Sequence, residues 1–158
     1  MPRTHFYPSS AIGVLLLGGA AFEFFWVSWM VEHGVPFDHI ATPMAPSRAT
    51  LIVGRALLTV SALCFAVAAV VCFQTQTIAP GSRLISKIFD FSFALGFLSM
   101  GFWSIYRLAL CLRYLRTTAL PEERSAVLSA VFYWLGSGLF FPLFGLNQIL
   151  WFLQRGSG

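Results

Sequence analysis

Charged side chains are scarce in this sequence, and their scarcity argues against a water-soluble protein. Only 10% of the 158 residues are Asp, Glu, Lys or Arg, whereas 58% are hydrophobic. A soluble globular domain carries about 25% charged residues, so this chain has too few of them to cover a surface that faces water. The length suits one domain, and we expect lipid to be the solvent for its apolar surface.

Lysine is almost absent, since Lys87 is the single example among ten basic residues. A net charge of +4 could indicate a nucleic-acid-binding protein. The arginines, however, stand at the ends of apolar segments instead of forming a basic cluster. Lipid phosphates are therefore the anionic partner that we expect, and nucleic acid is not.

Motifs for disulfides, metals and catalysis are also missing. The cysteines, Cys64, Cys72 and Cys111, are odd in number, dispersed and without a CxxC spacing, which argues against a disulfide framework. The histidines lie outside the apolar segments, where axial haem ligands would be needed. We find no HExxH, P-loop or Ser–His–Asp order. We therefore expect no metal site, no cofactor other than bound phospholipid such as cardiolipin, and no enzymatic activity.

Four long apolar segments make up most of the chain. A helix needs about 20 residues to cross the hydrocarbon core of a bilayer, and helices satisfy their backbone amides internally, as lipid requires. The first segment resembles a signal peptide, but its apolar character continues past the cleavage-like Ala21, so we expect an uncleaved anchor. The sequence predicts an all-α integral membrane protein, one polytopic domain over residues 1–158, with four transmembrane helices at about residues 10–31, 49–73, 86–112 and 126–153.

The connections between these segments are short. Four spans place both termini on one side of the membrane and the first and third loops on the other. Basic residues are in small excess on the side of those two loops, which favours that side as the positive one. Pro36, Pro43 and Pro46 predict an extended, ordered first loop. Pro121, followed by two glutamates, predicts the start of the last helix.

One carboxylate, Glu23, lies within the first apolar segment, and one guanidinium, Arg55, lies within the second. Counted from the segment ends, both fall at similar depths on consecutive antiparallel helices. A charge at the bilayer centre costs about 2.5–3.5 kcal/mol, and pairing reduces that cost. Small residues beside both groups indicate close helix contact. The sequence predicts an intramembrane ion pair that clamps the two helices, or alternatively a proton or ion path, or a site for a polar head group.

Basic and aromatic residues alternate at the end of the third segment. Arginine there can extend to lipid phosphates while its stem stays in hydrocarbon. We expect these residues to form an interfacial collar that binds an anionic lipid head group: Trp103, Tyr106, Arg107, Arg113, Tyr114 and Arg116.

The last segment contains "GSGLFFPLFG". Pro142 removes a backbone donor from the helix, and Gly138 stands one turn before it. The sequence predicts a kink at this pair. A kink that fits a neighbouring helix is commoner than one that builds a transport site.

These features favour a non-catalytic accessory subunit of a larger membrane complex. Small, arginine-collared, aromatic-rich chains are common in energy-transducing assemblies such as the respiratory chain or ATP synthase, which makes the mitochondrial inner membrane the expected location. The expected partners are other membrane subunits and anionic lipids. The alternative is a small transporter or proton-conducting protein that uses Glu23 and Arg55. An enzyme acting on a lipid or quinone is a third possibility, without a converging set of catalytic residues.

Overall fold

A computed structural model describes residues 10–34, 47–77, 83–117 and 119–156 of the chain. This part of the chain is helical, as predicted, and each of its long helices is long and apolar enough to cross a membrane. The proline-rich first loop falls outside the described residues, so its predicted extended conformation stays a prediction. The elements are α1 (Ser10–His33), α2 (Arg48–Thr77), α3 (Arg83–Thr117), η1 (Pro121–Glu123) and α4 (Arg124–Gly156).

All four helices cover the predicted apolar segments and run beyond them. The largest difference is at the end of α3, which continues to Thr117 instead of ending near residue 112. The added turn contains Arg113, Leu115 and Arg116. Leu and Arg are good helix formers, so polarity ends the apolar segment there without ending the helix.

Side-chain caps explain where two of the helices begin. Ser47 caps α2, because its Oγ accepts a hydrogen bond from the Thr50 backbone N–H at 3.1 Å. Between α3 and α4, the Glu123 carboxylate accepts a hydrogen bond from the Leu120 N–H at 3.1 Å and one from the Tyr114 hydroxyl at 2.9 Å. The predicted helix start at Pro121 is present as the 3-10 turn η1, and α4 begins directly after it.

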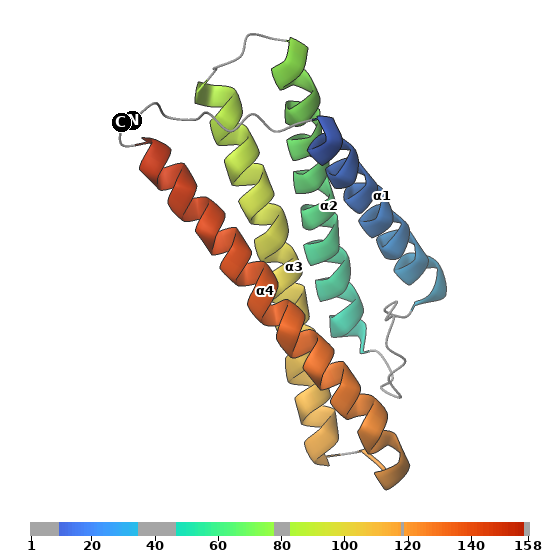
Figure 1. The fold of residues 1–158 in the computed structure, drawn as a ribbon. Helices are drawn as coiled ribbons and strands as arrows, with labels where there is room; N and C mark the ends of the chain where they lie inside the picture. The colour runs from blue at the N-terminus through green and yellow to red at the C-terminus, as the bar shows by residue number, and fades with distance from the viewer. Residues whose placement is uncertain (1–9, 35–46, 78–82, 118, 157–158) are drawn as a thin grey trace.

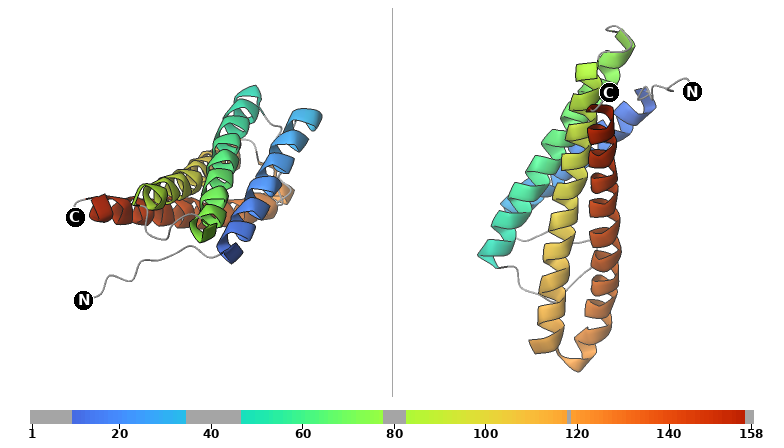
Figure 2. Two further views of the ribbon diagram at one scale, coloured as in Figure 1. Left: turned by 90° about the horizontal axis from the view of Figure 1, so that it is seen from above. Right: turned by 90° about the vertical axis from the view of Figure 1, so that its left-hand side faces the viewer.

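The helices form a row in chain order (Figure 1). α1 packs against α2, α2 against α3 and α3 against α4. Among the described residues, the two edge helices α1 and α4 do not contact each other, so the row stays open. Along the helix axes, the beginning of α1 and the end of α4 lie at the same end of the molecule. At the opposite end, α3 and α4 project as a helical hairpin past α1 and α2 (Figures 1 and 2).

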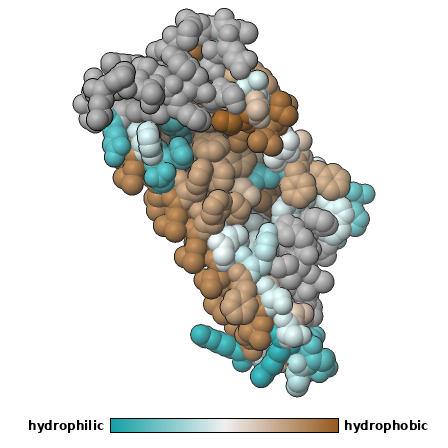
Figure 3. Space-filling model, viewed as in Figure 1, coloured by the Kyte–Doolittle hydropathy of each residue, from teal (hydrophilic) through white to brown (hydrophobic). Residues whose placement is uncertain are grey.

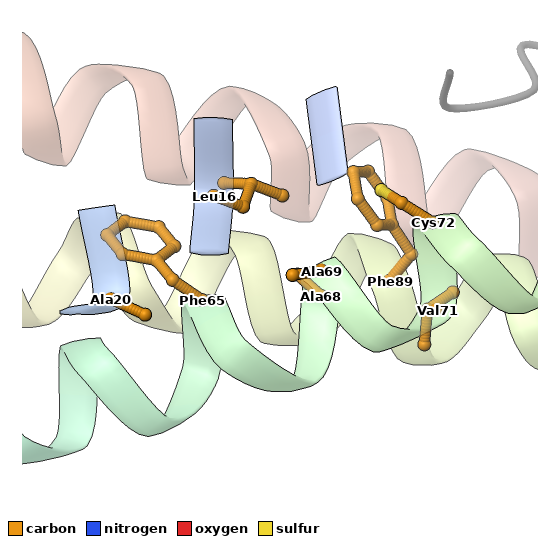
Figure 4. Packing of buried hydrophobic residues seen from close by; sticks show 8 residues of the cluster. All are labelled: Leu16, Ala20, Phe65, Ala68, Ala69, Val71, Cys72 and Phe89. Atoms are coloured by element: carbon orange, nitrogen blue, oxygen red, sulfur yellow. The ribbon is translucent and has the colours of Figure 1, made fainter. Parts of the chain in front are cut away.

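One core lies toward the end where α1 begins, since its α1 members lie in the first half of that helix, and Figure 4 shows how its side chains pack. Ala20, Ala68 and Ala69 are almost fully buried there, and their short side chains let the α1 and α2 backbones approach closely. We name this set the first core: Leu16, Ala20, Phe65, Ala68, Ala69, Val71, Cys72 and Phe89.

A second core lies toward the loop that joins α1 and α2. Gly54 is necessary there, because an added Cβ would lie 2.7 Å from Met30 Cε and 2.8 Å from the Trp103 ring. The residue therefore lets both side chains lie on the α2 backbone. We name this set the second core: Trp26, Met30, Leu58, Trp103, Cys111, Val127, Ala130 and Trp134.

Phenylalanine rings connect α2, α3 and α4. Phe97 on α3 is central, with ring centroids 5.2 Å from Phe65 on α2 and 4.8 Å from Phe144 on α4. Phe93, one turn earlier, lies 4.9 Å from Phe97 and 5.9 Å from Phe144. Edge-on and offset aromatic pairs at these separations stabilise beyond simple burial. The high phenylalanine content thus serves contacts between helices as well as the outer surface.

The outer surface is apolar along most of the helices. In the view of Figure 3 the hydrophobic colouring covers the middle of the molecule, and hydrophilic colouring gathers at the tip of the α3–α4 hairpin. Large apolar side chains are exposed on both edge helices, including Leu15 on α1 at 75% and Leu143 on α4 at 64%. Apolar surfaces of this extent are typical of sites that contact a membrane or another protein.

The contact between α3 and α4 explains Pro142 and two of the glycines of α4. An added Cβ at Gly101 on α3 would lie 2.5 Å from Pro142 Cγ. Gly138 and Gly145 likewise approach Ile105 and Leu98 on α3. α4 is a single helix through Pro142, and the predicted kink stays a prediction. What the structure adds is a packing role, because the rigid proline ring fills the space left by Gly101.

We expect Gly101→Ala to destabilise the protein by about 1–3 kcal/mol, the usual cost of overpacking, because neither the proline ring nor the backbone can move aside. Gly136→Ala is the matched control, since nothing lies within 4 Å of its added Cβ. Alanine there should stabilise the helix by up to about 1 kcal/mol. Thermal unfolding of the purified variants, followed by circular dichroism, measures both changes. Equal effects would contradict the close contact.

Candidate functional site

Glu23 is the most deeply buried carboxylate on α1, with 3% of its surface exposed. It shares the buried face of that helix with Ala20, Trp26 and Met30. Those positions recur every three or four residues, so they form one stripe that α2 covers. The carboxylate is therefore held between the two helices and not at the outer surface.

Ser61 on α2 is the hydrogen-bond partner of this carboxylate. Its hydroxyl lies 3.1 Å from Glu23 Oε1 and 3.1 Å from the backbone carbonyl of Gly96 on α3. The second contact depends on Gly96, because an added Cβ there would lie 2.7 Å from the Phe65 ring. Ser61 thus joins α1, α2 and α3 at one buried point. The other carboxylate oxygen, Oε2, is buried without a hydrogen-bond partner.

Arg55 is placed elsewhere. Its Nη2 donates to the backbone carbonyl of Met30 at 3.1 Å. Met30 is one of the last four residues of α1, and their carbonyls have no partner within the helix. A cation at this position also interacts favourably with the negative end of the helix dipole. Arg55 therefore caps the end of α1.

The structure does not bring Glu23 and Arg55 together as an ion pair, in contrast to the sequence-based expectation. Among the described residues, Glu23 contacts Ser61, and Arg55 contacts the Met30 carbonyl. Six residues separate Arg55 from Ser61 along α2, which is about 9 Å of helix. The depth estimate from segment ends was too coarse for such a distance. It also neglected that arginine extends toward the nearer helix end.

The predicted collar on α3 is divided between inside and outside. Trp103 and Arg107 are each only 2% exposed and belong to the interior, whereas Arg113 and Arg116 are exposed. Helical spacing explains the division, because positions four apart share a face and Arg116 lies about 180° from Arg107. The six residues therefore do not form one exposed band.

Each inner member of the collar has contacts within the protein. The Arg107 guanidinium lies over the ring of Trp103, at 5.7 Å from the centroid, and over that of Trp134 on α4, at 5.8 Å. These separations suit cation–π attraction. The Tyr106 hydroxyl lies 3.5 Å from Thr50 Oγ1 on α2. Arg113 and Arg116 are exposed, and their binding of lipid head groups stays a prediction.

Sequence reasoning missed Ser61 and Trp134 as members of these buried polar contacts. A signal existed for Ser61: it is a hydroxyl residue on the small-residue face of α2. Counted from the segment ends, it also falls at a depth close to that of Glu23 on the neighbouring antiparallel helix. No comparable signal existed for Trp134, which is 2% exposed in the second core.

Histidine and cysteine do not gather into a metal site in the part of the chain that the structure describes. His33 ends α1, stacks on Trp29 with ring centroids 4.4 Å apart, and its Nδ1 lies 3.1 Å from the Trp29 carbonyl oxygen.

Comparison with known proteins finds no matching family model, no matching curated protein and no matching solved structure.

Double-mutant cycles test which groups are partners. We expect Glu23→Leu and Ser61→Ala to be coupled by about 0.5–1.5 kcal/mol, the net value of a hydrogen bond. Glu23→Leu and Arg55→Met share no partner, so their effects should add within about 0.5 kcal/mol. The free energies of unfolding of the three single and two double variants, with that of the wild type, provide both coupling energies. A coupling energy between Glu23 and Arg55 that exceeds the one between Glu23 and Ser61 would support the ion pair instead.

Proposed function

We propose that this chain is an integral membrane protein that crosses the bilayer four times, with both termini on the same side, and serves as a non-catalytic accessory subunit of a larger membrane complex. The long apolar helices support the membrane assignment. The single observation that carries the accessory role is the open row of helices.

An open row leaves two helix flanks to be covered by something else. Of the most apolar stretch in each helix, 28% of α1 and 22% of α4 is buried, against 44% of α2 and 50% of α3. α1 and α4 therefore resemble edges at which packing stops within this chain. Lipid can cover such edges, but helices of neighbouring subunits do so with better packing, since helix association in membranes depends on close contact.

The projecting α3–α4 hairpin supports a second kind of contact. The 35 residues of α3 correspond to about 52 Å of helix, and the hydrocarbon core is about 30 Å thick. Part of the hairpin therefore extends beyond the hydrocarbon. Its exposed Arg113, Arg116 and Arg124 suit phosphates of anionic lipids such as cardiolipin, or acidic surfaces of partner subunits.

We place the complex among energy-transducing assemblies, the respiratory chain or ATP synthase, in the mitochondrial inner membrane. This part of the proposal rests on the general occurrence of small, arginine-collared, aromatic-rich subunits there. The alternative of a transporter or proton-conducting protein that uses a Glu23–Arg55 pair has less support, because the two side chains contact different partners.

Purification of the tagged chain from its native membrane in a mild detergent tests the accessory role. We expect it to elute with other membrane subunits at constant ratios, as mass spectrometry of the purified fraction would establish. A free monomer without stable partners would contradict the proposal.

Tryptophan substitution tests whether the edges are the contact surfaces. Leu15→Trp on α1 and Leu143→Trp on α4 should weaken co-purification without unfolding the chain, because close helix contacts do not accept the larger ring. Val67→Trp is the control, as this exposed position lies on α2, which already has a neighbour on each flank. Equal retention of partners by all three variants would argue against the edges.

A further inference from the structure

The buried junction of Glu23, Ser61 and Gly96 differs from the contacts of four other serines that lie within helices. Ser99, Ser104, Ser129 and Ser137 each donate to a carbonyl four residues earlier in their own helix. This is the usual way for a helical serine to satisfy its hydroxyl. The contacts of Ser61 instead lead to two other helices. Because Ser61 Oγ lies between two oxygen atoms, the number of protons on these groups decides which hydrogen bonds can form.

A serine hydroxyl carries one proton and can donate it to one acceptor at a time. Both neighbours of Ser61 Oγ, at 3.1 Å each, are acceptors if Glu23 is ionised. One of them would then face Ser61 Oγ without a proton between the two oxygens. Glu23 Oε2 would in addition be a buried anionic oxygen without a hydrogen-bond partner, and an unpaired buried carboxylate neutralises itself by binding a proton.

A proton on Glu23 Oε1 removes both difficulties. The acid O–H then donates to Ser61 Oγ, which accepts through a lone pair, and the Ser61 O–H donates onward to the Gly96 carbonyl. Each contact now contains one proton. Oε2 becomes a neutral carbonyl oxygen, for which a missing partner is far less costly than for an anion.

We propose that Glu23 is a proton-binding site that carries its proton at neutral pH and donates it in a hydrogen-bond chain from Glu23 on α1 through Ser61 on α2 to the Gly96 carbonyl on α3. The ligand of this site is a proton, and the chain holds three helices together without a buried charge.

The charged and titratable neighbours agree with a neutral acid. On α2, Cys64 is the titratable group that interacts electrostatically with Glu23, and a thiol offers no positive charge. Arg55, the nearest guanidinium along α2, contacts the end of α1. α3 presents the Gly96 backbone carbonyl, also without positive charge. No described cation therefore compensates an ionised Glu23. The inference does not depend on the accessory role.

Infrared spectroscopy of the purified full-length protein at neutral pH tests the proposal, because a protonated carboxyl has a C=O stretching band that an ionised carboxylate lacks. The chain has four glutamates, and the other three lie at or near helix ends. We expect one carboxylic-acid band that moves when glutamate side chains are labelled with carbon-13. This assignment needs no mutation.

Variants identify the residue. Glu23→Gln, a neutral mimic of the acid that keeps a donor, should fold and lose the band. Ser61→Ala should keep the band and shift it to higher frequency, because the acid loses its acceptor. Asp90→Asn, at the other buried carboxyl described (5% exposed), should leave the labelled band unchanged. Absence of a glutamate-sensitive acid band in the wild type, or its persistence in Glu23→Gln, would overturn the proposal.

Discussion

The constraint on which the structure depends is that apolar side chains cover the outside of the helices as well as the contacts between them. Leu15 on α1, Phe132 on α4 and Leu143 on α4 are each more than 60% exposed. A helix that is apolar all round needs an apolar medium on its free faces. We propose that this medium is the bilayer. Under that condition burial alone does not drive the helices together, because lipid tails are as apolar as the helix surfaces.

Contacts of close shape and buried hydrogen bonds must then hold the row together. The Gly101–Pro142 contact and the phenylalanine rings around Phe97 supply the first kind. The Ser61 junction and the Arg55–Met30 contact supply the second. Most of these contacts join successive helices, which explains how a row can be held together without closing into a bundle. The open edges are the structural reason for proposing neighbouring subunits.

Glu23 and Arg55, the charged residues predicted inside the first two apolar segments, are held by different partners. Opposite charges at similar depth suggest that they neutralise each other, but in the structure each side chain contacts a different partner. Arg55 reaches a helix end, where unpaired carbonyls accept from a cation, and Glu23 reaches a hydroxyl. A proton on Glu23 completes this arrangement. Glu23 then carries no buried charge, and neither side chain requires the other as a partner.

Sequence reasoning predicted the helices well and their contacts less well. The length of an apolar segment is almost sufficient to predict a helix long enough to cross a membrane, so the four helices could be predicted. The start near Pro121 could be predicted from the proline and the two glutamates after it. Contacts require the rotation and register of each pair of helices. Trp103 and Arg107 were therefore predicted at a lipid surface although they face the interior. Likewise, the distance between Arg55 and Ser61 is too small to be resolved by counting residues from segment ends.

The proposal that hydrocarbon surrounds the middle of the helices can be measured directly. Spin labels at positions 143, within α4, and 120, next to the hairpin turn, would measure it in lipid vesicles after replacement of the three native cysteines. Collision with oxygen, which concentrates in hydrocarbon, is compared with collision with a water-soluble nickel chelate. If hydrocarbon surrounds the middle of the helices, collision with oxygen dominates at position 143 and collision with the chelate dominates at position 120. Ready access of the chelate to position 143 would contradict the proposal.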